Sequence, residues 1–298
     1  MNKDFVIALD LGGTKIAGAI VDENFNMVIA ETIPSRDSIV GIADPALSRT
    51  KALISQLCAA AAFENLPIVR GAAGFPEYVN LAGLLTTADN IDWLEQPQSD
   101  FARLTGFPWL AQSDVRCAGL AEAQLGAGRD LTNFLYVTIS SGISHTHFIN
   151  GEAVTGPQGE AIGFGLIDLE IDGETLALEN YCSGLGIARR YARTSQDFSR
   201  DAKALLTIFE SNTQAQEIIS TAAQVLGREL AKFAYELQTS VIVIGGGLWL
   251  GSAKYRELVL VALESALQDY QLKVLVRNAE VEDSGVLGAA IYARADLD

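Results

Sequence analysis

A strand–turn–strand run at residues 5–21 is the feature that most constrains the fold. Residues 5–9 are apolar and rich in β-branched and aromatic side chains, which favours a buried strand. The chain then turns and returns as a second apolar run at residues 16–21. The turn contains Gly12 and Gly13, which permit tight backbone geometry and let N–H groups approach an anion. The run therefore predicts a β-hairpin with an anion-binding turn.

The polar side chains around this turn suit a nucleotide phosphate. Thr14 adds a hydroxyl donor and Lys15 adds a positive charge. Asp10, at the end of the first strand, is placed to bind a phosphate-bound Mg²⁺ directly or through water, because that cation prefers oxygen ligands. The pattern favours an ATP-binding turn. The alternative is an ordinary tight hairpin with a surface aspartate.

The same strand–turn–strand unit recurs in the second half of the chain. Residues 133–139 predict a strand, and residues 145–150 predict its return. The turn between them contains Ser140, Ser141 and Gly142, with a third hydroxyl at Ser144, so it offers donors and an unhindered backbone to a phosphate. The alternative is a plain serine-rich turn. Two copies of the unit predict a duplicated architecture.

We therefore expect an α/β fold with two lobes and a cleft between them. The smaller lobe is predicted to comprise residues 1–113 and a C-terminal helix at about 286–298, and the larger lobe residues 114–285. Asp44 and Pro45 predict the start of a helix that ends near residue 62. Further helices are predicted at residues 115–125, 184–194, 201–211, 213–237 and 252–269, and further strands at 66–73, 108–111 and 240–244.

Two other places carry candidate chemistry. Gly245, Gly246 and Gly247 follow a β-branched strand, where a flat ring could lie against bare backbone or a helix could start near a phosphate. Asp114 follows a predicted strand and precedes a helix, so its carboxylate could face a ligand and accept a proton from a hydroxyl. The alternative at this second place is that Ser113 or Asp114 caps the helix.

Composition excludes several classes of function. The formal net charge is -16 at pH 7, which argues against a nucleic-acid surface, since phosphate neutralisation needs clustered Lys and Arg. No stretch is long and apolar enough to span a bilayer, and no secretory pattern precedes the first strand, so we expect a soluble cytoplasmic protein.

The cysteines and histidines indicate no metal site. The three cysteines form no CxxC pair, so neither a zinc knuckle nor a disulfide framework is suggested. His145 and His147 lie on one face of a predicted strand, which needs no metal to explain it.

Taken together and in order, these motifs resemble the ROK family of bacterial sugar kinases and repressors. That family belongs to the superfamily of sugar kinases, actin and heat-shock ATPases, whose two-lobed fold is ribonuclease-H-like. The resemblance covers nearly the whole chain. It rests on the first phosphate motif at residues 9–15, the sugar-contact regions at 74–76 and 90–93, the catalytic pair at 113–114, the second phosphate motif at 140–144 and the adenosine region at 243–247.

The resemblance implies ATP-dependent phosphorylation of a hydroxyl on a hexose, an amino sugar or a related cyclitol. Asp114 would be the general base, and Asp10 would help to place Mg²⁺. The family commonly forms homodimers. Sugar contacts are implied for Gly74, Asn90, Asp92, Ser113, Asp114, Glu160 and Glu179.

The chain departs from the family pattern at the sugar and zinc motifs. Phe164 stands where the family has a histidine that contacts sugar and zinc, and the cysteine-rich zinc loop is absent, so we expect no zinc. Either Ala161 replaces the sugar-contacting glutamate, or Glu160 reaches the sugar across a one-residue shift. Ser113 replaces the asparagine before the catalytic aspartate. Apolar packing of residues such as Leu176 and Leu178 would then hold the loop.

Two alternatives come from other functional classes. A kinase-like sugar sensor without activity fits the altered sugar site. The family's repressors carry an N-terminal helix-turn-helix, and this chain starts at the phosphate strand, so we expect no DNA binding. An acyl or acetate kinase would leave Asp114 without a role, because such an enzyme need not deprotonate a hydroxyl.

Overall fold

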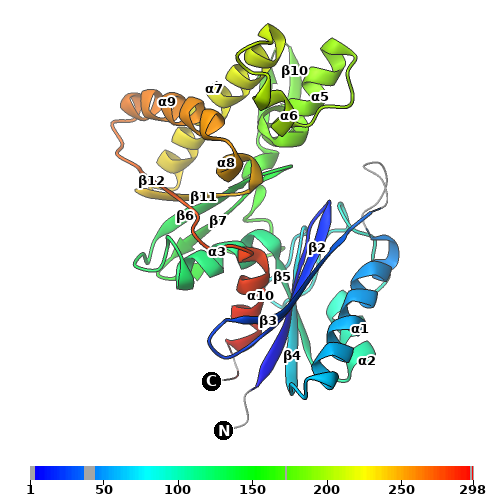
Figure 1. Cartoon of the computed structure of the whole chain (residues 1–298). Coiled ribbons are helices and arrows are strands. Elements are labelled where there is room, and N and C mark those ends of the chain that lie inside the picture. The colour runs from blue at the N-terminus through cyan, green and yellow to red at the C-terminus, as the bar shows by residue number, and fades with distance from the viewer. Residues whose placement is uncertain (1–3, 37–43, 172, 296, 298) are drawn as a thin grey trace. The chain divides into compact units, whose positions relative to one another are not determined.

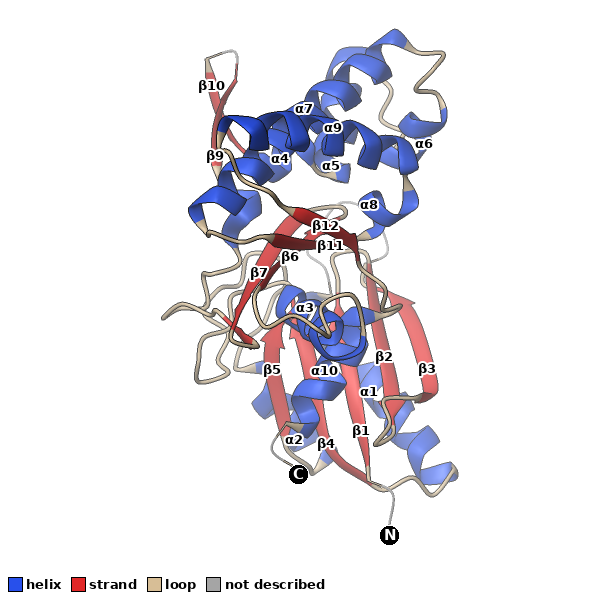
Figure 2. Cartoon of the chain, turned by 90° about the vertical axis from the view of Figure 1, so that its left-hand side faces the viewer, coloured by secondary structure: helices blue, strands red, loops and turns tan. Residues whose placement is uncertain are grey.

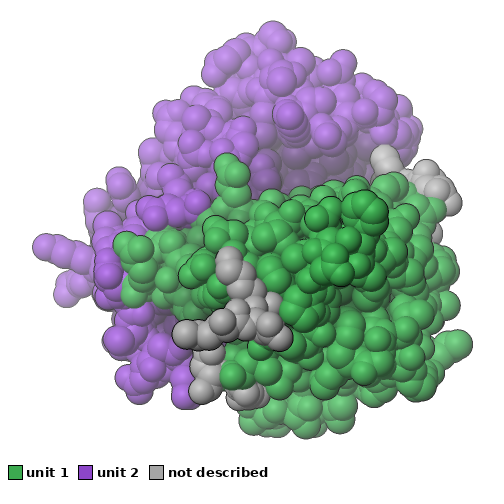
Figure 3. All heavy atoms as spheres, turned by 60° about the horizontal axis from the view of Figure 1, so that its bottom comes forward, with its two compact units in different colours: residues 1–129, 155–162, 281–298 green, residues 130–154, 163–280 purple. Residues whose placement is uncertain are grey.

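The computed structural model of the chain describes residues 4–36, 44–171, 173–295 and 297 (Figure 1). The chain divides into two compact units, which are coloured separately in Figure 3. Unit 1 comprises Met1–Arg129, Thr155–Ile162 and Val281–Asp298, and unit 2 comprises Asp130–Val154 and Gly163–Glu280. The chain therefore passes between the units four times, and unit 1 is assembled from three separate stretches of sequence.

The division differs from the predicted boundary after residue 113. Helix α3 (Asp114–Leu125) belongs to unit 1, where it packs on α10 (Ser284–Arg294) and on the sheet. A Cβ on Gly288 of α10 would stand 1.7 Å from the carbonyl oxygen of Cys117 in α3. The backbones of the two helices are thus in direct contact, and this contact fixes α3 to unit 1.

Unit 1 is built on a five-stranded sheet in the order β3-β2-β1-β4-β5. The first three strands form an antiparallel meander, and β1, β4 and β5 run parallel. The hairpin predicted at residues 5–21 is confirmed as β1 and β2. The strands are β1 (Phe5–Leu11), β2 (Lys15–Val21), β3 (Met27–Pro34), β4 (Ile68–Phe75) and β5 (Trp109–Ser113).

Different helices cover the two faces of this sheet (Figure 2). Successive side chains of a strand point to opposite faces, so Ile7 and Leu9 pack with α1 (Ser48–Phe63) and α2 (Pro97–Thr105). Val6 and Ala8 face the other way and pack with α3 and α10. The second face is rich in alanine, which lets its two helices lie close to the strands.

Unit 2 repeats this topology, which confirms the duplication predicted from the sequence. Its five-stranded sheet has the order β12-β11-β6-β7-β8, and each strand matches one of unit 1 in position and direction. A separate pair, β9 (Asp168–Ile171) and β10 (Glu174–Ala177), forms a hairpin. The sheet strands are β6 (Phe134–Ile139), β7 (Ile143–Ile149), β8 (Glu152–Ala153), β11 (Val241–Gly245) and β12 (Leu275–Asn278).

The helices of unit 2 enclose its main hydrophobic core. Buried residues of β6 and β11, such as Val137 and Ile244, pack with Leu226 of the longest helix and Val259 of its neighbour. Among the helices of the described ranges, none is long and apolar enough to cross a membrane. The helices are α4 (Leu178–Cys182), α5 (Gly184–Ser195), α6 (Ala202–Thr207), α7 (Thr213–Glu236), α8 (Gly247–Gly251) and α9 (Ala253–Asp269), with a 3-10 turn η2 (Gly163–Leu166).

The first helix begins later than Asp44 and Pro45 predict. Residues Pro45–Leu47 form a 3-10 turn, η1, with left-handed backbone angles at Ala46, and the α-helix starts at Ser48. Asp44 still provides hydrogen-bond acceptors for the first turn of the helix, because its carboxylate accepts the N–H groups of Arg49 and Thr50 at 2.6 and 2.9 Å. The predictions also miss α2, β12 and the β9–β10 hairpin, and α6 ends at Thr207 rather than near residue 211.

The contact between α3 and α10 generates a stability prediction. We expect Gly288→Ala to destabilise the chain by about 3 kcal/mol, because the clash is with backbone atoms that cannot rotate away. The measurement is the free energy of unfolding from urea denaturation. Gly251→Ala is the control, since a Cβ there would meet no atom within 4 Å. Equal stability of the two variants would contradict the packing described here.

Candidate functional site

The first phosphate turn lies in unit 1, between β1 and β2. The N–H of Gly12 donates to the carbonyl of Lys15 at 2.9 Å, which closes a tight turn. Lys15 is the first residue of β2, one residue earlier than predicted, and its side chain is exposed. The N–H of Ser35 donates to Thr14 at 3.1 Å, and Arg36 Nε donates to the carbonyl of Gly13 at 2.6 Å. Arg36, which the motif analysis missed, therefore adds a second cation beside the turn.

Asp10 lies at the carboxyl end of β1, next to Gly74 of β4 in the sheet register. Its carboxylate faces the start of α10, where a Cβ on Gly285 would stand only 2.5 Å from Oδ2. Burial raises the pKa of Asp10 to about 6; Lys15 opposes this rise and the charge of Asp283 adds to it. Asp10 is therefore ionised near neutral pH but is poorly solvated.

Asp114 directly follows β5, which is separated from β1 by β4 in the sheet, and it is the first residue of α3. Its Oδ1 accepts the N–H of Val115 at 2.7 Å, while the Ser113 side chain makes no capping bond to α3. Burial raises the pKa of Asp114 to about 7, and the negative charges of Asp10 and Glu77 push it in the same direction. The helix-capping alternative therefore does not hold for Ser113, and Asp114 has the electrostatic environment of a proton acceptor.

Gly74 brings these two carboxylates together. A Cβ at this position would stand 3.2 Å from the Cα of Asp114, so glycine lets the end of β4 lie against the start of α3. Asp10, Gly74 and Ser113 follow three adjacent parallel strands at one edge of the sheet. Ligands of open parallel sheets bind at this edge.

The loop that carries Asn90 and Asp92 is organised by a buried carboxylate. Glu77, which is 2% exposed, accepts the N–H groups of Asp89, Asn90 and Ile91 at 3.0, 2.6 and 3.0 Å. It also accepts the Thr87 hydroxyl at 2.5 Å. The side chains of Asn90 and Asp92 are exposed at the surface of this ordered loop. Glu77 was not among the predicted site residues, because nothing near it in sequence indicates its partners.

Glu160 lies in the stretch Thr155–Ile162, which the chain contributes to unit 1 from its middle. Its Oε2 accepts the N–H of Gln158 at 2.8 Å, and its carboxyl group lies against Gly156. The glutamate thus stabilises its own turn. Ala161 is anchored in the same stretch, through its N–H to the carbonyl of Thr155 at 3.1 Å.

The second phosphate turn lies in unit 2, where it is shorter than predicted. It comprises Ser140, Ser141 and Gly142, because β7 already begins at Ile143 and includes Ser144. The N–H of Ser140 donates to the carbonyl of Gly142 at 2.9 Å, and the N–H of Gly184 donates to Ser140 at 2.8 Å. The backbone at the start of α5 therefore stabilises this turn through a hydrogen bond.

The glycine run after β11 lies against this turn. Gly246 has a φ of 92°, and a Cβ there would stand 2.4 Å from the carbonyl oxygen of Ile139. Gly245 ends β11, and a Cβ on Gly247 would stand 3.6 Å from Ser140 Oγ. Only glycine allows this approach, so the structure brings the predicted adenosine region and the second phosphate turn together within unit 2.

Glu179 also lies on the second turn. Its Oε2 accepts the N–H of Ile143 at 3.3 Å, and a Cβ on Gly142 would stand 2.9 Å from that oxygen. It therefore belongs to unit 2, whereas Gly74, Asn90, Asp92, Ser113 and Glu160 belong to unit 1.

An aromatic cluster and a hairpin occupy the region of the family's zinc motif. The N–H of Phe164 donates to His145 Nδ1 at 3.0 Å, and the Phe164 and Phe233 rings stack with centroids 4.7 Å apart. In the hairpin that follows, Leu169 pairs with Leu176, and Leu178 is fully buried. Within the described residues, no three His, Cys, Asp or Glu side chains form a group suited to a metal ion. The residues of this region do not fit zinc.

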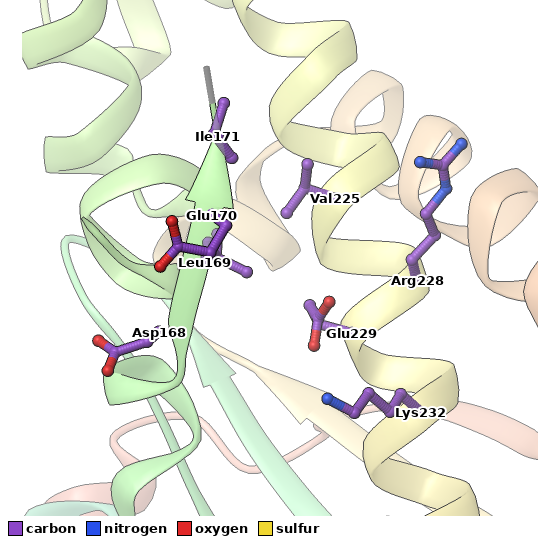
Figure 4. Close-up of a pocket in the computed structure, with 8 residues that line it drawn as sticks. All are labelled: Asp168, Leu169, Glu170, Ile171, Val225, Arg228, Glu229 and Lys232. Atoms are coloured by element: carbon purple, nitrogen blue, oxygen red, sulfur yellow. The ribbon is translucent and has the colours of Figure 1, made fainter. Parts of the chain in front are cut away.

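A cavity of about 320 Å³ in unit 2 lies apart from these features (Figure 4). It lies between β9 and α7, and its charged lining includes Glu170, Glu229 and Lys232. None of the predicted site residues lines it. The predicted site residues therefore lie outside this cavity.

The sequence model of the ROK family matches residues 6–296. The chain belongs to the ROK family. It is 31% identical over 303 residues to a protein of Shigella flexneri named "N-acetylmannosamine kinase", and the match covers 98% of this chain and 99% of that protein. The family resemblance seen in the sequence is therefore confirmed.

Solved structures of ROK proteins share the fold. The ROK hexokinase of Thermus thermophilus is 25% identical, with a TM-score of 0.78 and coverage of 98% of this chain and 99% of that chain. A ROK glucokinase of Streptomyces griseus, solved with glucose and AMPPNP, is 22% identical, with a TM-score of 0.79 and coverage of 97% and 99%. The predicted fold class, α/β with two lobes of the ribonuclease-H-like type, is confirmed.

The raised pKa of Asp114 generates a prediction for stability. Ionising a carboxyl group whose pKa rises on folding destabilises the folded chain. For Asp114 this loss of folding free energy is absent below about pH 4, the pKa of the carboxyl group in the unfolded chain, and is complete above about pH 7. We expect Asp114→Asn to raise Tm more at about pH 8 than at about pH 5 in metal-free buffer. Thermal denaturation measures this, with exposed Asp269→Asn as the control. An equal gain at both pH values, or an equal pH trend in the control, would contradict the prediction.

Proposed function

We propose that this chain is an ATP-dependent kinase that phosphorylates a hydroxyl of a hexose, an amino sugar or a related cyclitol, with N-acetylmannosamine as the first candidate acceptor. The observation that carries the proposal is Asp114, a crowded carboxylate beside Asp10 at the edge of the unit 1 sheet. The name of the Shigella flexneri relative supports the acceptor, and AMPPNP in the Streptomyces griseus structure supports ATP.

The two turns and the glycine run would hold the nucleotide. In unit 1, the backbone of Gly12 and Gly13, which carries no side chain, the Thr14 hydroxyl and the Lys15 ammonium suit phosphate oxygens. In unit 2, the hydroxyls of Ser140 and Ser141 and the backbone of Gly142 suit the same chemistry, and Gly245, Gly246 and Gly247 present bare backbone beside them. Such preorganised donors stabilise the charge that phosphoryl transfer spreads over the phosphate oxygens.

Asp114 would act as the general base. A carboxylate with a pKa of about 7 is a stronger proton acceptor than an ordinary aspartate, so it can take the proton of the attacking hydroxyl. Asp10 offers oxygen donors of the kind that Mg²⁺ prefers, directly or through water. Bound with ATP, Mg²⁺ would neutralise phosphate charge.

Candidate residues of unit 1 would orient the acceptor. Asn90 and Asp92 present exposed polar side chains, whereas Gly74 and Ser113 are buried beside Asp114. Glu179, which belongs to unit 2, is a further candidate contact. Oε2 of Glu160 accepts the N–H of Gln158, and Ala161 stays the alternative at the sugar-contact position. The homodimer implied by the family stays a prediction.

The experiment is ADP release from Mg-ATP with a panel of hexoses, amino sugars, N-acetylated sugars and cyclitols. We expect one acceptor to give release, and Asp114→Asn to lower kcat by about 100-fold or more while ATP still binds, because general bases contribute on that scale. Asp269→Asn, which removes an exposed charge from the end of α9, should match the wild type.

Two results would contradict this proposal. Full turnover by Asp114→Asn would exclude Asp114 as the base. Acceptor binding in calorimetry without ADP release would favour the non-catalytic sugar sensor. Trapping of an acyl phosphate by hydroxylamine would favour an acyl kinase instead.

A further inference from the structure

Arg116 is a buried cation that the proposed chemistry does not use. It lies on α3, two residues after Asp114, and only 2% of its surface is exposed. Its Nη1 donates to the carbonyl of Val79 at 2.8 Å and to Gln112 Oε1 at 3.2 Å. Its Nη2 donates to the carbonyls of Thr155 and Gly159 at 3.0 and 2.7 Å. One guanidinium thus binds three backbone carbonyls from two distant stretches of unit 1.

Each of the two stretches joined by Arg116 carries candidate acceptor contacts. Val79 lies in the loop at residues 76–93, which includes Asn90, and Gly159 precedes Glu160. Gly159 has a φ of 86°, and a Cβ there would stand 2.4 Å from the carbonyl oxygen of Val79. The two stretches are therefore in backbone contact, directly beside the guanidinium.

A second contact joins the same two stretches at the surface. The Thr86 hydroxyl donates to the carbonyl of Gln158 at 2.6 Å, and Thr86 is exposed. Glu77 holds the far part of the first loop through the N–H groups of Asp89, Asn90 and Ile91. Glu77 therefore orders this loop internally, whereas Arg116 and Thr86 tie it to the other stretch.

The charge of Arg116 is costly to bury, and its hydrogen bonds to the two stretches offset that cost. Burial lowers the pKa of Arg116 to about 10, so it stays ionised at neutral pH. In the described part of the chain no carboxylate forms an ion pair with it, and its buried Nε has no hydrogen-bond partner. An apolar side chain of similar size would avoid the cost of burying a charge but would leave these carbonyls without the donors that Arg116 supplies. The guanidinium is planar and rigid, so its N–H donors fix the positions of several carbonyls relative to one another.

We propose that Arg116 is a positioning residue for the acceptor: it fixes the loop at residues 76–93 and the stretch at 155–162 relative to the start of α3, and so to Asp114. This inference rests on the proposed kinase function. Holding the acceptor groups at a set distance from the base lowers the barrier to transfer, because small misplacements of reacting groups are costly. Arg116 itself would contact neither the acceptor nor ATP.

The test compares Arg116→Met, Arg116→Lys and Thr86→Val with the wild type. We expect Arg116→Met to raise the acceptor KM about tenfold or more and to leave the ATP KM within about twofold, a split that general loss of folded protein would not produce. Arg116→Lys should restore part of the loss, since Lys keeps the charge but not the fork of donors. Thr86→Val should give a smaller shift in the same direction.

Hydrogen exchange gives a readout that does not depend on turnover. Amides at residues 76–93 and 155–162 should exchange faster in Arg116→Met, while those of β11 in unit 2 should be unchanged. Unchanged exchange in both stretches would overturn the inference. If Arg116→Met fails to fold, the acceptor KM of Thr86→Val becomes the test. A wild-type acceptor KM in Thr86→Val would then overturn the inference.

The failure of this inference is distinguishable from failure of the proposed function. A wild-type chain that neither binds nor phosphorylates any acceptor in the panel contradicts the proposed function, and the role of Arg116 falls with it. An active wild type whose acceptor KM is unchanged in Arg116→Met and Thr86→Val contradicts the role of Arg116 alone.

Discussion

Close backbone contact at the carboxyl edge of the unit 1 sheet is the constraint on which the candidate site depends. Gly74 lets β4 meet the start of α3, Gly285 lets α10 meet the Asp10 carboxylate, and Gly288 lets α10 lie against α3. A side chain at any of these positions would separate elements that carry Asp10 or Asp114. Because the three contacts share α3 and α10, the two aspartates are held by one packed arrangement rather than by flexible loops.

This packing has an electrostatic consequence. It removes water from Asp10 and Asp114 and brings negative groups near each other, so the pKa of each carboxyl rises, to about 6 and about 7. Such an arrangement destabilises the folded chain at neutral pH, yet it suits the proton acceptor and the Mg²⁺ site that we propose. Unit 2 repeats the topology, but its corresponding edge carries the serine turn and Gly246 in place of carboxylates.

The sequence predicts the features that depend on local pattern. The hairpins, the long helices and the duplication follow from apolar runs and glycine turns, and the motif order identifies the family. Features that depend on distant partners were missed: Glu77 binds amides 12 to 14 residues away, and Arg116 binds carbonyls 37 to 43 residues away. Short or mixed elements such as α2 and β12 lack a clear period. Asp44 signalled a helix start, but an intervening turn moved that start to Ser48.

The central claim is that this chain transfers phosphate from ATP to a sugar hydroxyl. Phosphorus NMR of the wild-type protein with Mg-ATP and N-acetylmannosamine, followed by the rest of the sugar panel, tests it most directly, because it identifies the bond that forms. We expect a sugar phosphomonoester resonance to grow as the γ-phosphate resonance of ATP decays. Unchanged ATP, or inorganic phosphate as the only product with every acceptor, would contradict the claim.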